Sequence, residues 1–205
     1  GGDGMECIID PNNGNIQYAA AQFGAIYKTT DGWTTPLTIQ NEIVKSNQSA
    51  IGIDQKSAWV TPYLMHPNNS NTLIVGKQQV YQTTNGGANW SAISGTFPSF
   101  IKSMAYAPSN PQVIYVASDG EIWKTTNGGN SWFLFTTSAL SITYLAVDPN
   151  NASRVWLSNS GYVTADKVWL IEVNHYPSLN DDRIISLVKN ILNTTVIMME
   201  SLLLN

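Results

Sequence analysis

The 205-residue sequence has one cysteine, two histidines and only ten basic residues. A lone cysteine, Cys7, excludes an intrachain disulfide, and its place in an apolar segment predicts a buried, unreactive thiol. No group of His, Cys and carboxylate residues has metal-site spacing, no glycine-rich phosphate loop carries a lysine, and no serine lies in a nucleophile elbow. The sequence therefore predicts neither a metal nor another cofactor.

Charge is also scarce. Charged residues make up 12% of the chain, about half the usual share, and the net charge is −4. Without a basic field, binding to nucleic acid is not expected. The apolar runs are far shorter than the ~20 residues that span a bilayer, so membrane insertion is not expected either. The polar surface must come from Asn, Ser, Thr, Gln and Gly, which is typical of turn-rich β structure.

The sequence is rich in repetition. One phrase occurs three times, as IYKTTDGW at 26–33, VYQTTNGGANW at 80–90 and IWKTTNGGNSW at 122–132. Longer segments align on four prolines that are 56, 41 and 41 residues apart, namely Pro11, Pro67, Pro108 and Pro149. A period near 41 residues fits the four-stranded blade of a β-propeller.

Each repeat unit reads as a series of short strands. Apolar residues alternate before each proline, as a half-buried strand requires, and the proline with its following Asn or Ser turns the chain. Second strands are expected at 16–19, 73–76, 113–117 and 155–157. Third strands carry the pairs Ile26-Tyr27, Val80-Tyr81, Ile122-Trp123 and Val168-Trp169. We therefore expect an all-β fold of four-stranded antiparallel blades at about 5–60, 61–100, 101–141 and 142–170, with an insertion at about 34–60.

The repeated phrase ends in a turn whose residue types all have mechanical uses. An Asp or Asn side chain can accept N–H groups across its own turn, the glycines supply positive φ, and the tryptophan can bury an apolar face over the hairpin. The turn is thus predicted to be structural rather than a binding site. Its residues are Thr29, Asp31, Gly32, Thr83, Asn85, Gly87, Trp90, Thr125, Asn127, Gly129 and Trp132.

These turns resemble Asp-box (BNR) repeats, which occur in sialidases, sortilin-type receptors, xyloglucan-specific glucanases and secreted bacterial propellers. The resemblance implies that the boxes lie on the outer rim, away from the axial binding surface. The first box departs from the pattern, because Trp33 stands where glycine is expected and Pro36 stands at the Trp position. A turn of different shape is therefore expected there.

The repeats predict an incomplete ring. A propeller needs at least four blades to close, and this sequence has about three blades and a fraction of another. We expect an arc of a larger ring, with its remaining blades elsewhere. The tail at 171–205 contains no glycine and no box. It is interpreted either as a helix over 181–193 or as a frameshifted segment that was never selected to fold.

Few residues are candidates for catalysis or ligand binding. Sialidases bind a carboxylate with three arginines, whereas this chain has only Arg154 and Arg183. Asp3 lies in the glycine-rich stretch GGDGM before the first strand, at a position expected to face the axis, and is the candidate for catalysis or ligand contact. Trp33 and Trp59 could stack on sugar rings, although packing explains them too.

Two functions remain open. The first is a secreted or cell-surface propeller that presents its loops to a protein or polysaccharide at the propeller axis. The alternative is part of a xyloglucanase-like glycoside hydrolase whose catalytic carboxylates are shared with other blades, since glycoside hydrolysis needs a pair of them. Whether this chain belongs to an enzyme is not decided by its sequence. Extracellular location is implied by the resemblance.

Overall fold

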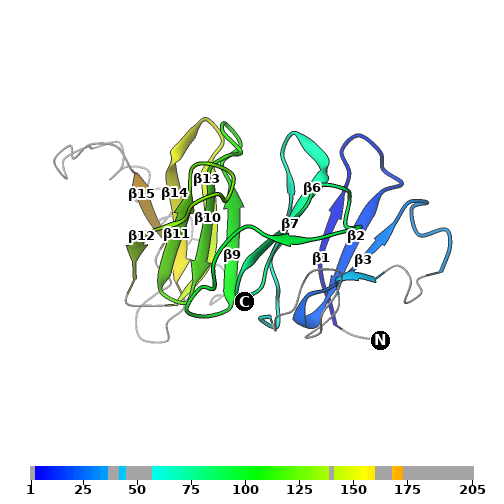
Figure 1. Cartoon of the computed structure of the whole chain (residues 1–205), viewed down its shortest axis with the longest axis horizontal. Helices are drawn as coiled ribbons and strands as arrows, with labels where there is room; N and C mark the ends of the chain where they lie inside the picture. The colour runs from blue at the N-terminus through cyan, green and yellow to red at the C-terminus, as the bar shows by residue number, and fades with distance from the viewer. Residues whose placement is uncertain (1–2, 37–41, 45–56, 139–140, 160–167, 173–205) are drawn as a thin grey trace, which may run out of the picture. The chain divides into compact units, whose positions relative to one another are not determined.

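The computed structural model describes residues 3–36, 42–44, 57–138, 141–159 and 168–172. In this part of the chain the strands form four antiparallel sheets (Figure 1), three with four strands and one with three. The only helical element described there is one 3-10 turn, η1 (Gln22–Gly24). No helix in the described residues is long and apolar enough to cross a membrane. The all-β prediction is confirmed.

Each sheet is a meander in which every strand pairs with the next one along the chain. The first sheet contains β1 (Gly4–Ile9), β2 (Gln17–Ala21), β3 (Ala25–Thr29) and β4 (Glu42–Val44). The second contains β5 (Tyr63–His66), β6 (Asn69–Gly76), β7 (Val80–Thr83) and β8 (Ser91–Ala92). The third contains β9 (Ile101–Tyr106), β10 (Ile114–Ser118), β11 (Glu121–Thr125) and β12 (Phe133–Thr137). The fourth contains β13 (Ile142–Asp148), β14 (Asn151–Asn159) and β15 (Val168–Glu172).

The proline of each repeat lies in the turn between the first two strands of its sheet. In the first, second and fourth sheets, the side chain of the residue before this proline fastens the turn. In the first sheet Asp10 Oδ1 accepts the N–H of Asn12 at 2.8 Å, and in the second sheet His66 Nδ1 accepts the N–H of Asn68 at 3.1 Å. Side-chain acceptors of this kind are typical of Asx-like turns. The repeated prolines thus mark equivalent corners of successive sheets.

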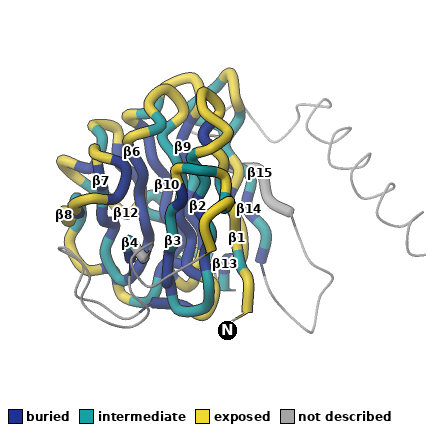
Figure 2. Tube along the Cα trace, turned by 90° about the vertical axis from the view of Figure 1, so that its right-hand side faces the viewer, coloured by how far each residue is buried: buried dark blue, intermediate teal, exposed yellow. Residues whose placement is uncertain are grey.

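Neighbouring sheets pack face to face through three apolar clusters. Burial of this apolar surface is the main force that holds the sheets together. Figure 2 shows the buried strands between turns that are largely exposed. The first and second sheets share a cluster that includes Tyr18, Ile26, Tyr63 and Leu73. The second and third share Ile74, Val80, Ile101 and Met104, and the third and fourth share Tyr115, Ile122, Ile142 and Leu145.

The expected second strands correspond to β2, β6, β10 and β14, although β2 and β10 begin one residue later than predicted, and the expected third strands lie within β3, β7, β11 and β15. The outermost strands β4, β8 and β12 carry no pattern that had identified them, and β4 lies inside the predicted insertion. The predictions for the tail at 173–205, including the helix, fall outside the described residues.

The prediction of a buried Cys7 is wrong, because this thiol is exposed. Met5 and Ile8 of β1 pack against the cluster shared with the second sheet. Cys7 and Ile9 do not belong to that cluster, and Ile9 is 59% exposed. The apolar segment was correctly identified as a strand, but in the described residues no other sheet covers this face of it.

Candidate functional site

The repeated turn after β7 is organised by one hydroxyl group. Thr83 Oγ1 accepts the N–H groups of Asn85 and Gly87, at 3.3 and 3.0 Å, and donates to Asn85 Oδ1 at 2.8 Å. Asn85 Oδ1 also accepts the N–H of Asn89 at 3.0 Å. The polar side chains of this turn are thus engaged with their own loop.

The turn after β11 repeats this arrangement. Thr125 Oγ1 accepts the N–H of Gly129 at 3.0 Å and donates to Asn127 Oδ1 at 2.9 Å. Asn127 Oδ1 accepts the N–H of Ser131 at 2.9 Å. The same residue types therefore form the same set of bonds in two different sheets.

The first turn also has this shape, so the expectation of a different one is wrong. Thr29 Oγ1 donates to Asp31 Oδ1 at 2.6 Å and accepts the N–H of Trp33 at 3.2 Å. Asp31 Oδ2 accepts the N–H of Thr35 at 3.0 Å. Hydrogen bonds from Thr29, and then from Thr35, lower the pKa of Asp31 to about 2. The tryptophan adopts φ of 64°, in the region that favours glycine.

The second glycine of each later turn lies against the neighbouring sheet. A Cβ on Gly87 would stand 2.6 Å from Cδ1 of Ile43, and one on Gly129 would stand 2.8 Å from Cδ1 of Ile93. Both glycines also have strongly positive φ, 96° and 99°. Glycine is therefore needed at this position for two reasons. It adopts the positive φ of the turn, and it lets the preceding sheet approach closely.

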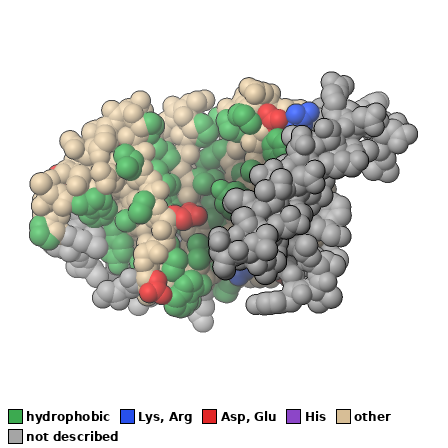
Figure 3. Space-filling view, turned by 180° about the vertical axis from the view of Figure 1, so that it is seen from behind, with side chains coloured by type: hydrophobic (Ala, Val, Ile, Leu, Met, Phe, Trp, Pro, Cys, Tyr) green, Lys and Arg blue, Asp and Glu red, His purple; other side chains and the backbone are tan. Residues whose placement is uncertain are grey.

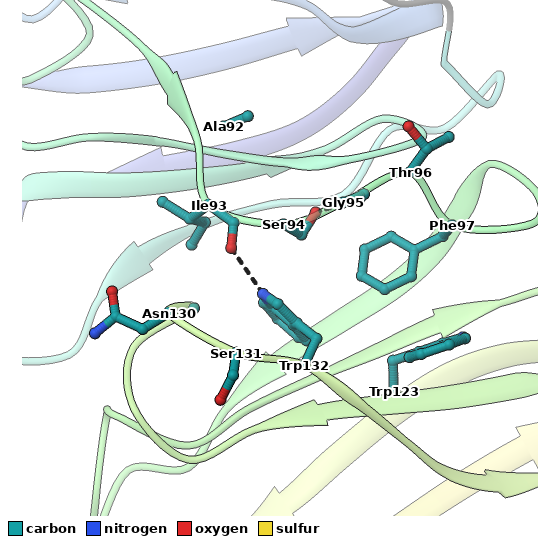
Figure 4. Close-up of a pocket in the computed structure, with 11 residues that line it drawn as sticks. Ala92, Ile93, Ser94, Gly95, Thr96, Phe97, Trp123, Asn130, Ser131 and Trp132 are labelled. Carbon is teal, nitrogen blue, oxygen red and sulfur yellow. Dashed lines mark hydrogen bonds between the residues drawn. The ribbon is translucent and has the colours of Figure 1, made fainter.

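The tryptophans of the later turns also reach the preceding sheet. Trp90 is buried in the cluster shared by the first and second sheets. Trp132 Nε1 donates to the carbonyl oxygen of Ile93 at 2.7 Å (Figure 4).

Beside this bond lies an open groove of about 610 Å³ whose walls include Phe97, Trp123 and Trp132. The ring of Phe97 lies 5.6 Å from that of Trp123 and 5.7 Å from that of Trp132, so the aromatic groups pack against one another.

Several carboxylates are also engaged in local structure. Asp10 and Asp148 accept N–H groups in their proline turns, and Glu121 Oε2 accepts the indole N–H of Trp123 at 2.9 Å. Asp119 lies in the β10–β11 turn with φ of 54°. Charged side chains are few on the face seen in Figure 3. No group of three or more His, Cys, Asp or Glu residues in the described ranges could hold a metal ion.

One carboxylate that the sequence did not single out has an unusual environment. Partial burial raises the pKa of Glu6 on β1, although the residue as a whole is exposed, and a hydrogen bond from the backbone of Tyr63 partly opposes this rise. The Tyr63 hydroxyl in turn donates to the carbonyl oxygen of Glu6 at 2.9 Å. No local pattern in the sequence signals these hydrogen bonds, because their partner lies on another sheet, in β5.

The three predicted contact residues do not lie together. Asp3 is exposed and precedes Gly4, which pairs with Ala21 immediately before η1. Trp59 lies against η1, since its carbonyl oxygen accepts the N–H of Phe23 and the two rings meet edge to face at 4.9 Å. Trp59 is 51% exposed.

Trp33 lies at the other end of the same sheet. Its neighbour Gly32 donates its N–H to the carbonyl oxygen of Asn15, in the proline turn between β1 and β2. The strand pairing places Asp3 beside the opposite turn, at η1. The structure therefore brings Asp3 and Trp59 to one end of the first sheet and separates Trp33 from them.

Comparison with protein families and with curated proteins found no match. Solved structures do resemble the chain. An ancestral GH74 enzyme matches 89% of this chain at 22% identity with a TM-score of 0.61, and the match covers 25% of that enzyme. The chain has a β-propeller fold.

Other similar structures are named for different roles. YCF48 bound to D1 peptide matches 79% of this chain at 17% identity, with a TM-score of 0.51 and 47% of its own length covered. An auxiliary nutrient binding protein from Bacteroides thetaiotaomicron matches 86% at 12% identity, with a TM-score of 0.52 and 44% covered. The chain thus spans between a quarter and just under half of these three structures, and at these identities the likeness shows the fold alone.

Proposed function

We propose that this chain is part of a secreted or cell-surface β-propeller that serves as a rigid scaffold for binding a protein or a polysaccharide, and that the chain itself is not catalytic. The main support for this proposal comes from the contacts that the repeated turns make. Their polar groups bond within their own loops, and their glycines and tryptophans contact the preceding sheet. The repeated residues therefore stabilise the fold.

In this proposal the turns are Asp boxes with a structural role. Thr83, Asn85 and Gly87 close the turn and place Trp90 on the preceding sheet, and the equivalent residues of the third sheet do the same. Further blades of the ring would supply the rest of the scaffold. Peptide binding by YCF48 and nutrient binding by the Bacteroides protein, as their printed names state them, agree with a binding role.

The end of the first sheet that holds Asp3 and Trp59 is the proposed contact surface. An exposed indole offers a flat apolar face to a sugar ring or a peptide side chain. Phe23, which packs against Trp59, has a left-handed backbone with φ of 60°. Non-glycine residues in this conformation are sparsely populated and often mark functional sites.

A glycoside hydrolase is the second candidate, and the carboxyl of Glu6 favours it. A general acid in glycoside hydrolysis needs a raised pKa, and burial raises the pKa of this group. In this alternative Glu6 or Asp3 would act with a second carboxylate from a blade outside this chain. The GH74 likeness agrees with it at the level of the fold.

One set of variants of the complete protein separates these functions. We would measure binding to, and hydrolysis of, xyloglucan and other β-glucans by the wild type and by Asp3→Ala, Glu6→Gln and Trp59→Ala. The scaffold proposal predicts no hydrolysis, and binding that weakens in Trp59→Ala but persists in Trp33→Ala, the matched tryptophan at the other end of the sheet. Hydrolysis that is lost in Asp3→Ala or Glu6→Gln would establish the enzyme instead.

A further inference from the structure

The junction between the first and second sheets is filled by a pair of large side chains. Tyr18 and Lys28 face each other as cross-strand partners on β2 and β3. Lys28 Nζ lies 5.6 Å from the centre of the Tyr18 ring and donates to the carbonyl oxygen of Gly86, in the turn of the next sheet, at 2.8 Å. The pair therefore closes the space between the first sheet and the repeated turn of the second.

The junction between the third and fourth sheets holds the same pair. Tyr115 and Lys124 are cross-strand partners on β10 and β11, and the ammonium group lies 5.0 Å from the Tyr115 ring. The Tyr115 hydroxyl donates to the carbonyl oxygen of Ala152 in the fourth sheet at 2.9 Å.

The middle junction lacks this pair. The equivalent partners on β6 and β7 are Ile74 and Gln82, which are shorter than tyrosine and lysine. A pocket of about 310 Å³ lies there, between the second and third sheets, and Gln82 forms part of its wall. Gln82 thus lines an open space at the position where lysine fills the neighbouring junctions, while Ile74 belongs to the apolar cluster of this junction.

Uncharged polar groups surround this pocket. His66 comes from β5 and Tyr106 from β9, with their rings edge to face at 5.3 Å. The Tyr106 hydroxyl is shielded from solvent, and no group in the described residues makes a hydrogen bond of normal geometry with it. Gln82 lies near enough to oppose the burial that raises the pKa of Tyr106.

The pocket carries no charged side chain. Its remaining polar wall consists of hydroxyl and amide groups, including those of Thr72, Thr84, Gln112 and Asn130. Burial lowers the pKa of His66, so its ring is neutral at pH 7. Because Nδ1 accepts the N–H of Asn68, the ring proton belongs on Nε2, where it can be donated. An ion would find no opposite charge here, and an apolar ligand would leave the polar wall unpaired.

We propose that this junction pocket, bounded by His66, Gln82 and Tyr106, binds a small neutral polyhydroxy ligand, such as one ring of a sugar. Hydroxyl groups of the ligand would both donate to and accept from the amide and hydroxyl wall. The paired rings of His66 and Tyr106 supply the aromatic surface on which a sugar can pack. The volume lies at the small end of the usual range for ligand pockets. This site is separate from the Asp3–Trp59 surface proposed above.

The direct test is a titration of the chain with glucose, xylose and galactose, followed by the NMR signals of the Gln82 and Gln112 side-chain amides. We expect saturable shifts with at least one sugar and a weaker response to N-methylacetamide. In Gln82→Lys the new ammonium group should reach the carbonyl of Gly128, as Lys28 reaches that of Gly86, and close the pocket. Binding, read from the Gln112 amide, should then weaken by about tenfold or more, the equivalent of losing at least one good hydrogen bond.

The charge-matched control is Asn89→Lys, which places the same cation on an exposed residue outside the pocket wall and should leave sugar binding unchanged. Should Gln82→Lys fail to fold, as judged by circular dichroism, Gln112→Ala removes an exposed wall amide and should also weaken binding. The absence of saturable shifts with all three sugars, an equal response to N-methylacetamide, or unchanged affinity in the variant that folds would overturn the proposal.

Discussion

Gly129 lies so close to Ile93 that a Cβ on the glycine would stand 2.8 Å from the isoleucine Cδ1. One residue belongs to a repeated turn of the third sheet and the other follows the outer strand β8 of the second. Gly87 and Ile43 repeat this relationship between the second and first sheets, at 2.6 Å. The turn glycine is therefore also part of the contact between sheets.

Adding a methyl group at these glycines should destabilise the fold. Gly129→Ala and Gly87→Ala would each force the isoleucine to move and would place alanine at a strongly positive φ, at a cost of about 2–4 kcal/mol. Chemical denaturation measures this. Gly95→Ala is the matched control, because nothing lies within 4 Å of its Cβ position, and a change within about 0.5 kcal/mol is expected there. Equal effects at Gly95 and Gly129 would argue against the contact.

The hydroxyl of Thr83 should contribute more to the stability of the fold than the hydroxyl of Thr84. Thr83→Val keeps the shape of the side chain but removes the acceptor for the N–H groups of Asn85 and Gly87. We expect a loss of about 1–3 kcal/mol in the free energy of unfolding. Thr84→Val, at the next and exposed residue, should change little. If both variants unfold alike, the hydroxyl does not organise the turn.

The first turn should respond to acid. Hydrogen bonds lower the pKa of Asp31 in the folded state from an ordinary value near 3.8 to about 2. The stability that this carboxylate contributes is therefore present above about pH 4 and is lost as the pH falls towards 2. Asp31→Asn should be close to wild type at pH 7, because Asn85 and Asn127 fill this position in the other turns.

Urea midpoints between pH 7 and pH 2 provide the measurement. The midpoint of the wild type should fall more steeply than that of Asp31→Asn as the pH falls through this window, since the amide does not titrate. Parallel curves over the whole range would show that the carboxylate has an ordinary pKa.

A buried lysine should make stability rise in mildly alkaline solution. Lys77 is fully buried, and desolvation lowers its pKa from 10.5 to about 8. Between these values the unfolded chain binds more protons than the folded chain, so unfolding becomes less favourable as the pH rises, by at most about 1.4 kcal/mol per pH unit. Lys77→Met should flatten this slope.

Thermal or urea unfolding between pH 8 and pH 9 tests this, below the range where the tyrosines of the unfolded chain, with ordinary pKa values of about 10, ionise appreciably. Exposed Lys102→Met is the control and should keep the slope of the wild type. A wild-type stability that stays level or falls over this interval would contradict the lowered pKa of Lys77.

Local patterns in the sequence predicted the strands that carry the repeat. The alternation before each proline and the pairs such as Ile122-Trp123 are properties of adjacent residues, and they correspond to β strands in all four sheets. The outer strand β8 has only two residues, Ser91 and Ala92, which pair with Gln82 and Tyr81 of β7. Its own sequence carries too little information to identify it.

Features that depend on a neighbouring sheet were missed or mistaken. Cys7 lies on an apolar strand, but burial requires a sheet against that face, and none of the described sheets covers it. The hydrogen bonds between Glu6 and Tyr63 of β5 also join two sheets and could not be predicted from either strand alone. The junction pocket depends on the pairing of Ile74 with Gln82, which becomes meaningful only beside the equivalent pairs in the other sheets.

The most direct test of the structural role of the repeated turns is a double-mutant cycle between Gly87 and Ile43, where the closest atom to the added methyl group is the Cδ1 end of the isoleucine. The free energy of unfolding would be measured for Gly87→Ala, Ile43→Ala and the double variant. If the glycine is needed because the isoleucine presses on it, shortening Ile43 should relieve part of the penalty at Gly87, and the double variant should be more stable than the sum of the single losses predicts, by about 1 kcal/mol or more. Strict additivity of the two losses would mean that the turn does not fasten one sheet to the next, and the account would fail.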